Sequence, residues 1–227
     1  MKITAAVVDE KSAPFVLREL ELEAPRSDEV LVRIVATGIC QSDLHVRDQE
    51  YPVPLPAVFG HEGAGVVAAV GATVNSVSPG DHVILSYQAC GRCRPCLQGH
   101  YSYCERAFEA NFGGARLDGS NGLRHNGAGP EVHGHFFGQS SFATYSLATE
   151  RNVVKVPRDV ALELLGPHAF DTLTSEEHDA LRLRFGLNGG NALSMKELAP
   201  LLGCSRAKAG ELVGRAIDKM RVQLLRE

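Results

Sequence analysis

The sequence predicts an α+β chain of two parts, a β-rich domain followed by a small all-α helix-turn-helix domain. Three observations lead to this prediction. Short β-branched and alternating runs fill residues 1–156, and the apolar period becomes helical over residues 174–227. A compact cluster of cysteines lies within the first part. Residues 157–173 are the expected linker between the two domains.

Seven runs of the first part have the composition of strands. They are Ile3–Val8, Phe15–Glu23, Val30–Thr37, Gly65–Val70, Val83–Ser86, Phe142–Leu147 and Val153–Val156. Pro52, Pro54 and Pro56 keep their stretch out of regular structure, and the glycine-rich residues 113–134 predict a loop. Gly63-Ala-Gly-Val-Val-Ala68 fits the glycine pattern of a dinucleotide-binding loop, but no helix follows it, so a strand is expected there.

Four cysteines, Cys90, Cys93, Cys96 and Cys104, have the spacing Cys-x2-Cys-x2-Cys-x7-Cys. Four thiolates at this spacing close a tetrahedral shell around one zinc and leave no open position, which indicates a structural site. Such a cluster favours reduced thiols and a cytoplasmic protein over a disulfide scaffold. We expect no membrane span and no signal peptide, since no apolar run approaches the required length and no charged-then-apolar leader follows Met1.

Two further motifs are Gly38-Ile-Cys-Gln-Ser-Asp-Leu-His45 and Gly60-His-Glu-Gly-Ala-Gly65. Together with the four cysteines they resemble the zinc-dependent medium-chain alcohol dehydrogenases, over residues 1–167. Phe112–Asp118 and Gly134–Tyr145 lean towards the aryl- and class III-like members of that family. The resemblance implies a GroES-like β domain with a structural zinc, here a fragment of the family's catalytic domain at residues 1–156.

The resemblance also implies roles for individual residues. Cys40 and His61 would ligate a second, catalytic zinc, and Glu62 would lie beside it. Ser42 and His45 would form the relay that removes the alcohol proton. In this family the zinc holds the alcohol as an alkoxide, so that hydride can leave to a nicotinamide.

The sequence departs from the family at the catalytic site. Asp43 would orient the imidazole of His61, as in the family, but the third zinc ligand, a cysteine soon after Leu-Gly-Pro, is missing. Here Leu165-Gly166-Pro167 is followed by His168-Ala169-Phe170, and we interpret His168 as an exposed linker residue. The family's NAD-binding Rossmann domain has no counterpart in these residues. The catalytic residues are therefore expected to be vestigial, the second zinc site incomplete, and NAD unbound without another domain.

The second part has the pattern of three helices. Thr174-x-x-Glu177 and Ser194-x-x-Glu197 are capping boxes, and Ser205 is the expected N-cap of the last helix. The apolar face of that helix comprises Ala209, Leu212, Ala216, Met220 and Leu224. Two short helices, a glycine-containing turn and a basic second helix make the helix-turn-helix pattern.

Residues 170–221 resemble region 4 of sigma-70-type RNA polymerase factors, through Leu181-Arg-Leu-Arg-Phe-Gly-Leu187 and Arg215-Ala-Ile-Asp-Lys-Met-Arg221. The resemblance implies DNA and RNA polymerase as partners. The residues expected to contact DNA are Ser205, Arg206, Lys208, Arg215, Lys219 and Arg221. Residues 168–227 carry nine Lys and Arg against eight Asp and Glu, so a small three-helix module with a merely solvated charged face is the alternative.

Three functions follow from these patterns. The favoured hypothesis is a zinc-binding, DNA-binding protein of sigma-factor-like type, because its helical module is complete. The first alternative is a zinc-dependent alcohol dehydrogenase fragment that needs an external NAD-binding domain. The second alternative is an inactive gene-fusion remnant, which would bind one zinc and self-associate through the strand edges of its incomplete β domain.

Overall fold

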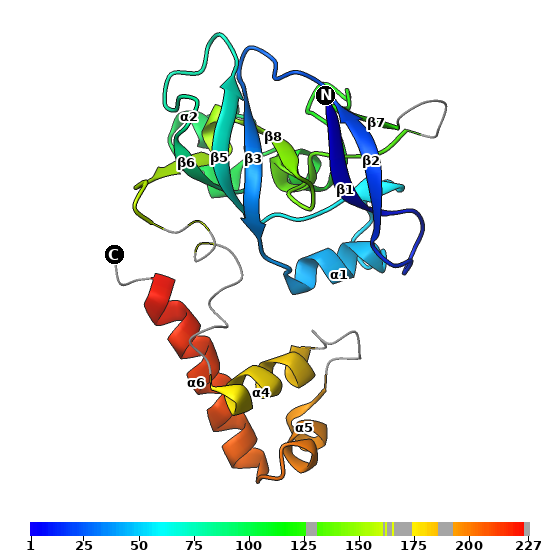
Figure 1. The fold of residues 1–227 in the computed structure, drawn as a ribbon, viewed down its shortest axis with the longest axis vertical. Coiled ribbons are helices and arrows are strands. Elements are labelled where there is room, and N and C mark those ends of the chain that lie inside the picture. Colours follow the sequence, from blue (N-terminus) through cyan, green and yellow to red (C-terminus); the bar gives the residue numbers. More distant parts are fainter. Residues whose placement is uncertain (126–130, 161, 163–164, 166–173, 186–192, 225–227) are drawn as a thin grey trace. The chain divides into compact units, whose positions relative to one another are not determined.

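The structure is a computed structural model, and it describes residues 1–125, 131–160, 162, 165, 174–185 and 193–224 (Figure 1). The chain divides into two compact units, Met1–Gly166 and Pro167–Glu227. Most of the expected linker lies outside the described residues, as do His168 and Phe170.

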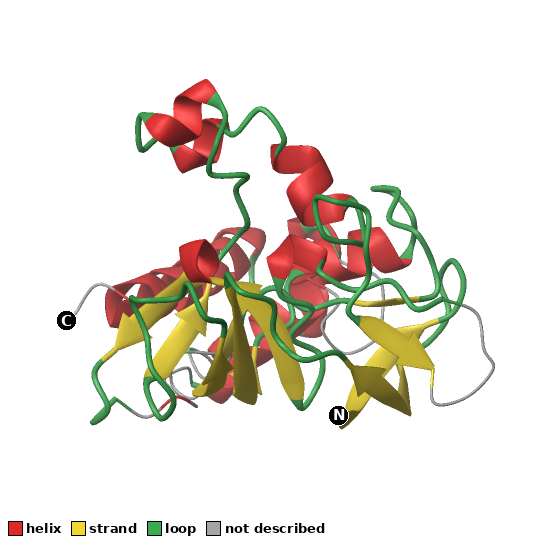
Figure 2. Ribbon diagram, turned by 90° about the horizontal axis from the view of Figure 1, so that it is seen from above, coloured by secondary structure: helices red, strands yellow, loops and turns green. Residues whose placement is uncertain are grey.

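The first unit is built on two antiparallel sheets, whose strands are yellow in Figure 2. The larger has the order β8-β3-β5-β6-β9. Its strands are β3 (Glu29–Thr37), β5 (Gly63–Val70), β6 (His82–Leu85), β8 (Tyr145–Thr149) and β9 (Val153–Val156). The smaller has the order β4-β1-β2-β7, with β1 (Lys2–Val8), β2 (Val16–Leu22), β4 (Ala57–Val58) and β7 (Leu123–His125).

The first half of strand β3, residues 29–32, is buried on both of its faces. Val30 and Val32 pack with Val67 of β5 in one apolar cluster, while Leu31 points the other way and packs with Leu147 in a second cluster. Alternate residues of a strand face opposite sides of the sheet, so the apolar run Val30–Val32 suits this central position, and the exposed Arg33 ends it. The core therefore holds β3 and β5 rigidly, and the candidate site lies at their ends.

The described part of the first unit also contains short α-helices and 3₁₀ turns. They are α1 (Gln41–Arg47), α2 (Arg94–Leu97), α3 (Ala107–Phe112), η1 (Tyr101–Tyr103), η2 (Phe136–Gly138) and η3 (Glu150–Asn152). Helix α1 follows β3 directly, and the Asp43 carboxylate accepts the backbone N–H of Cys40 to cap its first turn.

Each of the seven predicted strands has a counterpart, including the strand expected at the glycine-rich run of β5. The prediction of a loop throughout residues 113–134 was wrong, since β7 lies within it. Strand β7 is three residues long and pairs with β2 at Leu20, Glu21 and Leu22. Its pairing depends on a partner about 100 residues away in sequence, which a local pattern does not reveal.

The second unit contains α4 (Ser175–Phe185), α5 (Met195–Leu201) and α6 (Arg206–Leu224). Both predicted capping boxes are confirmed: Glu177 accepts the N–H of Thr174, and Glu197 accepts the N–H of Ser194. Ala209, Leu212 and Ala216 of α6 are buried, as the predicted apolar face requires. That these helices form a separate helix-turn-helix domain stays a prediction. None of the helices within the described residues combines the length and apolarity needed to cross a bilayer.

Candidate metal centres

The four cysteines of the loop after β6 converge on one point. Their four Sγ atoms all lie within 4.8 Å of one another, and no disulfide joins them. The cysteines are Cys90, Cys93, Cys96 and Cys104. The Sγ atoms of Cys90 and Cys96 are 3.9 Å apart. A tetrahedral zinc with four Zn–S bonds needs sulfurs separated by about 3.8 Å, so the cluster fits zinc.

Backbone N–H groups already point at these sulfurs. The N–H of Cys93 donates to Cys90 Sγ at 3.4 Å, and the N–H of Cys90 donates to Cys104 Sγ at 3.3 Å. Burial works to raise the pKa of the Cys90 thiol, but N–H donors from Arg92 and Cys93 outweigh it and lower that pKa. The loop thus favours thiolate at Cys90, the state that a zinc ligand requires.

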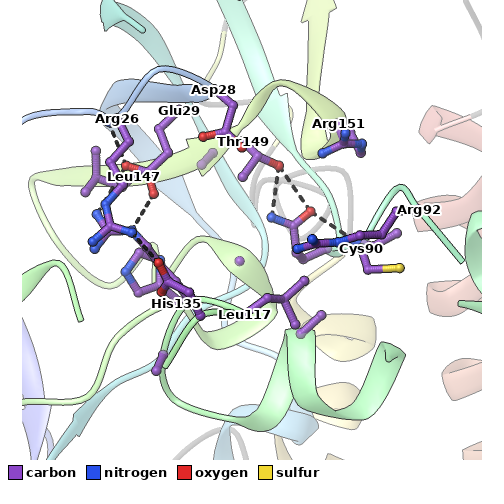
Figure 3. A pocket seen from close by; sticks show the side chains of 18 residues that line it. Arg26, Asp28, Glu29, Cys90, Arg92, Leu117, His135, Leu147, Thr149 and Arg151 are labelled. Atoms are coloured by element: carbon purple, nitrogen blue, oxygen red, sulfur yellow. Dashed lines mark hydrogen bonds and ion pairs between the residues drawn. The ribbon is translucent and has the colours of Figure 1, made fainter. Parts of the chain in front are cut away.

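A cavity of about 200 Å³ adjoins the cysteine loop (Figure 3). Two of its arginines are neutralised at its far side, where Arg26 pairs with Asp118 and Arg116 pairs with Glu29. Its acidic and basic side chains nearly balance, and Cys90 is the one residue of the two metal clusters among the described residues that line it. We therefore place the chemistry at the clusters rather than in this cavity.

A second cluster joins Cys40, His61 and Glu62, whose ligand atoms lie within 4.8 Å of one another. Cys40 is the N-cap of α1, and the other two lie in the turn between β4 and β5. The Glu62 carboxylate lies against Gly38, where any side chain would collide with it. A soft thiolate, an imidazole and a carboxylate are donors that zinc accepts together, so this cluster also fits zinc.

Asp43 connects the two segments of this cluster. Its side chain is completely buried, and Oδ1 accepts the N–H of Gly60 at 3.0 Å and lies 3.3 Å from Nδ1 of His61. Oδ2 accepts the N–H of Cys40 at 2.9 Å. Because Nδ1 of His61 faces Asp43, Nε2 is the ring nitrogen left for a metal.

The imidazole of His61 is strongly basic in the absence of metal. Burial works to lower its pKa, but hydrogen bonds to Asp43 and Cys40 outweigh burial and raise the pKa to about 10. The pKa of Cys40 is lowered, chiefly by the hydrogen bond from His61. The metal-free cluster therefore favours a thiolate–imidazolium pair.

Ser42 and His45 both lie on α1 beside this cluster. Ser42 Oγ is 3.7 Å from Cys40 Sγ. Nδ1 of His45 contacts a carboxylate oxygen of Glu50, and its ring meets Tyr51 edge-on at 5.9 Å. Within the described residues no hydrogen bond joins Ser42 to His45.

Aromatic rings and a glutamine that the sequence did not single out surround His61. Phe137 stacks on its imidazole at 4.6 Å, and Phe136 meets it edge-on at 5.5 Å. Phe112 contacts both phenylalanines, and Gln139 donates to the His61 carbonyl. The sequence signal for these residues was their place in the two family motifs, Phe112–Asp118 and Gly134–Tyr145.

The residues expected to bind DNA lie in or next to α6. Ser205 Oγ caps the helix by accepting the N–H of Lys208 at 3.2 Å. Lys208 and Arg215 both pair with Glu211. Arg206 is exposed on the first turn of α6, and Lys219 and Arg221 belong to its last turns. The positive charge of this surface is thus partly neutralised within the helix itself.

Among known protein families, the model of the alcohol dehydrogenase GroES-like domain matches residues 26–158 of this chain. Geraniol dehydrogenase of Castellaniella defragrans is 49% identical over 164 residues, which is 72% of this chain and 43% of that protein. The chain thus spans about half the length of the relatives it matches.

Two solved structures are similar. The alcohol dehydrogenase zinc-binding domain protein of Burkholderia ambifaria has a TM-score of 0.71 and 52% identity, covering 83% of this chain and 50% of that one. Benzyl alcohol dehydrogenase of Acinetobacter calcoaceticus has a TM-score of 0.69 and 46% identity, covering 82% of this chain and 48% of that one.

These relatives correct the functional hypothesis that the sequence favoured. The prediction of a sigma-factor-like DNA-binding protein was wrong, because the relatives are alcohol dehydrogenases at 46–52% identity. The helical pattern is complete, but the pairing of Lys208 and Arg215 with Glu211 weakens a phosphate-binding face. DNA and RNA polymerase as partners stay predictions. The matched residues 26–158 contain both metal clusters, and the chain belongs to the alcohol dehydrogenase GroES-like domain family.

Proposed function

We propose that the first unit is the zinc-holding part of a zinc-dependent alcohol dehydrogenase. The four cysteines hold a structural zinc, and Cys40, His61 and Glu62 hold a catalytic one. The observation that carries this proposal is the convergence of these three donors from two segments about 20 residues apart, with buried Asp43 behind them. A cytoplasmic location belongs to the proposal, since thiolate ligands require reduced cysteines.

When bound at Cys40 and His61, zinc supplies the Lewis acidity that stabilises an alcohol as its alkoxide. Ser42 is proposed to relay the alcohol proton: its Oγ, which lies beside Cys40, would accept that proton and release its own hydroxyl proton towards His45. Glu50 holds Nδ1 of His45, which leaves Nε2 of that ring to pass the proton towards solvent.

The rings of Phe112, Phe136 and Phe137 form an apolar wall next to His61 and exclude water from it. Relatives are named for geraniol and for benzyl alcohol, and such a wall suits the same class of apolar and aromatic alcohols. The nicotinamide cofactor is proposed to bind on another domain or chain.

The first test counts metals. Purified chain loaded with zinc should hold two zinc ions per chain, and Cys40→Ala should hold one. A single zinc in the unsubstituted chain would contradict the catalytic assignment and favour the inactive remnant.

The second test concerns activity. The chain is mixed with the separately produced nicotinamide-binding domain of a relative, and NADH formation from benzyl alcohol is followed at 340 nm. Turnover that disappears in Cys40→Ala would support the proposal. Turnover that survives in Cys40→Ala would arise elsewhere and would contradict it.

A further inference from the structure

The loop that covers His61 has an unusual backbone. His135, Phe137 and Ser140 have φ values of 61°, 51° and 51°, and Gly138 between them has 66°. Residues other than glycine seldom adopt this left-handed region, and clusters of them persist only where the surroundings impose the conformation. Such clusters are characteristic of functional sites, so the contacts that impose this one are informative.

Hydrogen bonds tie the loop to the segment that carries the metal ligand. Ser140 Oγ donates to the carbonyl of Val58 at 2.7 Å, and the N–H of Ser141 donates to the carbonyl of Gly60 at 3.0 Å. From the other side, Nδ2 of Asn152 donates to the carbonyl of Gly138 at 3.1 Å. The loop is therefore fixed directly against residues 58–60, the approach to His61.

Gln139 continues this attachment across the ligands themselves. Its Nε2 donates to the carbonyl of His61 at 2.9 Å and to that of Ser86 at 3.1 Å, and its Oε1 accepts the N–H of Gly63 at 3.1 Å. The side chain is only 2% exposed. Both amide hydrogens and the oxygen are used, so one residue brackets His61 and Glu62 on either side.

The same loop also fixes the ring of His61. Phe137 stacks on the imidazole with an interplanar angle of 26°, and Phe136 meets it at 88°. With Asp43 holding Nδ1, the ring is constrained on its face, on its edge and at one nitrogen. The carbonyl of His61 is held by Gln139, so this residue fixes the main chain from which the ring projects.

We propose that Gln139 is a positioning residue for the metal ligands His61 and Glu62, acting through the main chain of residues 61–63. This inference rests on the proposed function of the cluster. Ser86 follows β6 and precedes the cysteine loop by a few residues, so the same side chain also anchors the end of β6.

Three variants separate positioning from general stabilisation. Gln139→Leu removes all three hydrogen bonds at similar volume. Gln139→Glu keeps the acceptor for Gly63 but, when ionised, gives no donor to His61 or Ser86. Gln49→Leu is the matched control, because Nε2 of Gln49 also donates to two carbonyls, Val46 at 2.9 Å and Val53 at 3.0 Å, without touching residues 61–63.

The experiment loads the four-cysteine centre with one equivalent of zinc and titrates the second centre with Co²⁺, following its thiolate-to-cobalt absorption. Removal of a residue that supports a metal ligand typically weakens metal binding about 10- to 100-fold. We expect that loss in Gln139→Leu and Gln139→Glu, with an altered cobalt spectrum. Gln49→Leu should keep the affinity and spectrum of the unsubstituted chain.

Wild-type affinity and spectrum in both Gln139 variants would overturn the positioning role while leaving the metal site intact. If Gln139→Leu does not fold, Gln139→Glu decides in the same way. An equal loss of cobalt affinity in Gln49→Leu would show that the loss comes from general destabilisation of the fold, and this result would also overturn the inference. Failure of the unsubstituted chain to bind any second metal would instead contradict the proposed function.

Discussion

Oδ1 of Asp43 lies 3.3 Å from Nδ1 of His61, and the other oxygen of the same buried carboxylate accepts the N–H of Cys40. One side chain therefore sets both the ring of one proposed zinc ligand and the backbone of another. An asparagine amide has one oxygen and one NH2 group, so it satisfies only part of this arrangement.

We therefore expect Asp43→Asn to weaken metal binding at the second centre about 10- to 100-fold. A competition titration with a chromophoric chelator measures the affinity. Asp48→Asn is the control, since Asp48 ends the same helix but pairs with Arg47 away from the ligands. Equal affinities in Asp43→Asn and the unsubstituted chain would show that the contact does not support the metal.

Metal uptake at the second centre should depend on pH. The pKa of His61 is raised to about 10 in the metal-free chain, because hydrogen bonds to Asp43 and Cys40 outweigh the effect of burial. A metal ligand must be neutral imidazole, so binding displaces this proton at any pH below about 10. Apparent affinity should rise with pH, by up to about tenfold per unit between pH 6 and 9. Zinc competition titrations at several pH values measure the slope, and a flat profile after correction for the chelator would contradict the assignment.

A side chain at Gly91 should push the guanidinium of Arg151 away from the four-cysteine loop. The φ of Gly91 is +72°, and a Cβ there would collide with the guanidinium of Arg151. Gly99 in the same loop has φ +81° and open space around it. Gly99→Ala should thus cost only backbone strain of about 1–2 kcal/mol, while Gly91→Ala should cost more and release zinc faster.

The double variant Gly91→Ala/Arg151→Ala separates the two costs at Gly91. It should recover part of the lost stability, because the collision is removed and the strain remains. Thermal unfolding and zinc transfer to a chelator provide the measurements. Indistinguishable behaviour of Gly91→Ala and Gly99→Ala would show that Arg151 does not constrain the loop.

The local features of this molecule could be predicted from its sequence. The alternation in β1, the β-branched run of β3 and the cysteine spacing are each set by neighbours in the chain, and the structure brings those cysteines together. The contacts that shape the second centre are different. Gln139 reaches His61 across 78 residues, and no periodicity encodes that distance. Phe137 was visible only as part of a family motif, since its stacking depends on a left-handed backbone that the loop imposes.

In the helical unit the local structure was predicted correctly, but the function inferred from it was wrong. Its capping boxes and apolar face are local signals and were predicted correctly, but a helical pattern alone does not identify a function. The basic residues that suggested DNA binding are not all free to bind phosphate, because Lys208 and Arg215 both pair with Glu211 in the folded helix. Charge pairing at a spacing of three and four residues was the sequence signal that argued against a phosphate-binding face.

His135 should make the stability of the first unit fall in mild acid. Burial, reinforced by the charges of Arg116 and Arg26, lowers the pKa of this imidazole to about 3, against an ordinary value near 6.5. The unfolded chain takes up a proton below about pH 6.5, and the folded chain does not until about pH 3. The contribution of His135 is therefore complete above pH 6.5 and is lost as pH falls towards 3, with a slope of up to about 1.4 kcal/mol per pH unit.

His135→Asn tests this dependence, because asparagine does not titrate and tolerates the left-handed φ of 61°. The free energy of unfolding in urea is measured between pH 7.5 and 4 for both proteins. The slope of unfolding free energy against pH should be smaller in the variant, by an amount that corresponds to nearly one proton. The carboxylates and cysteines contribute equally to both proteins, so they do not affect this difference. His100→Asn, at an exposed histidine, is the control for the replacement of an imidazole by asparagine. Parallel curves for His135→Asn and the unsubstituted chain would show that His135 is protonated in the fold, and that its burial does not exclude the charge.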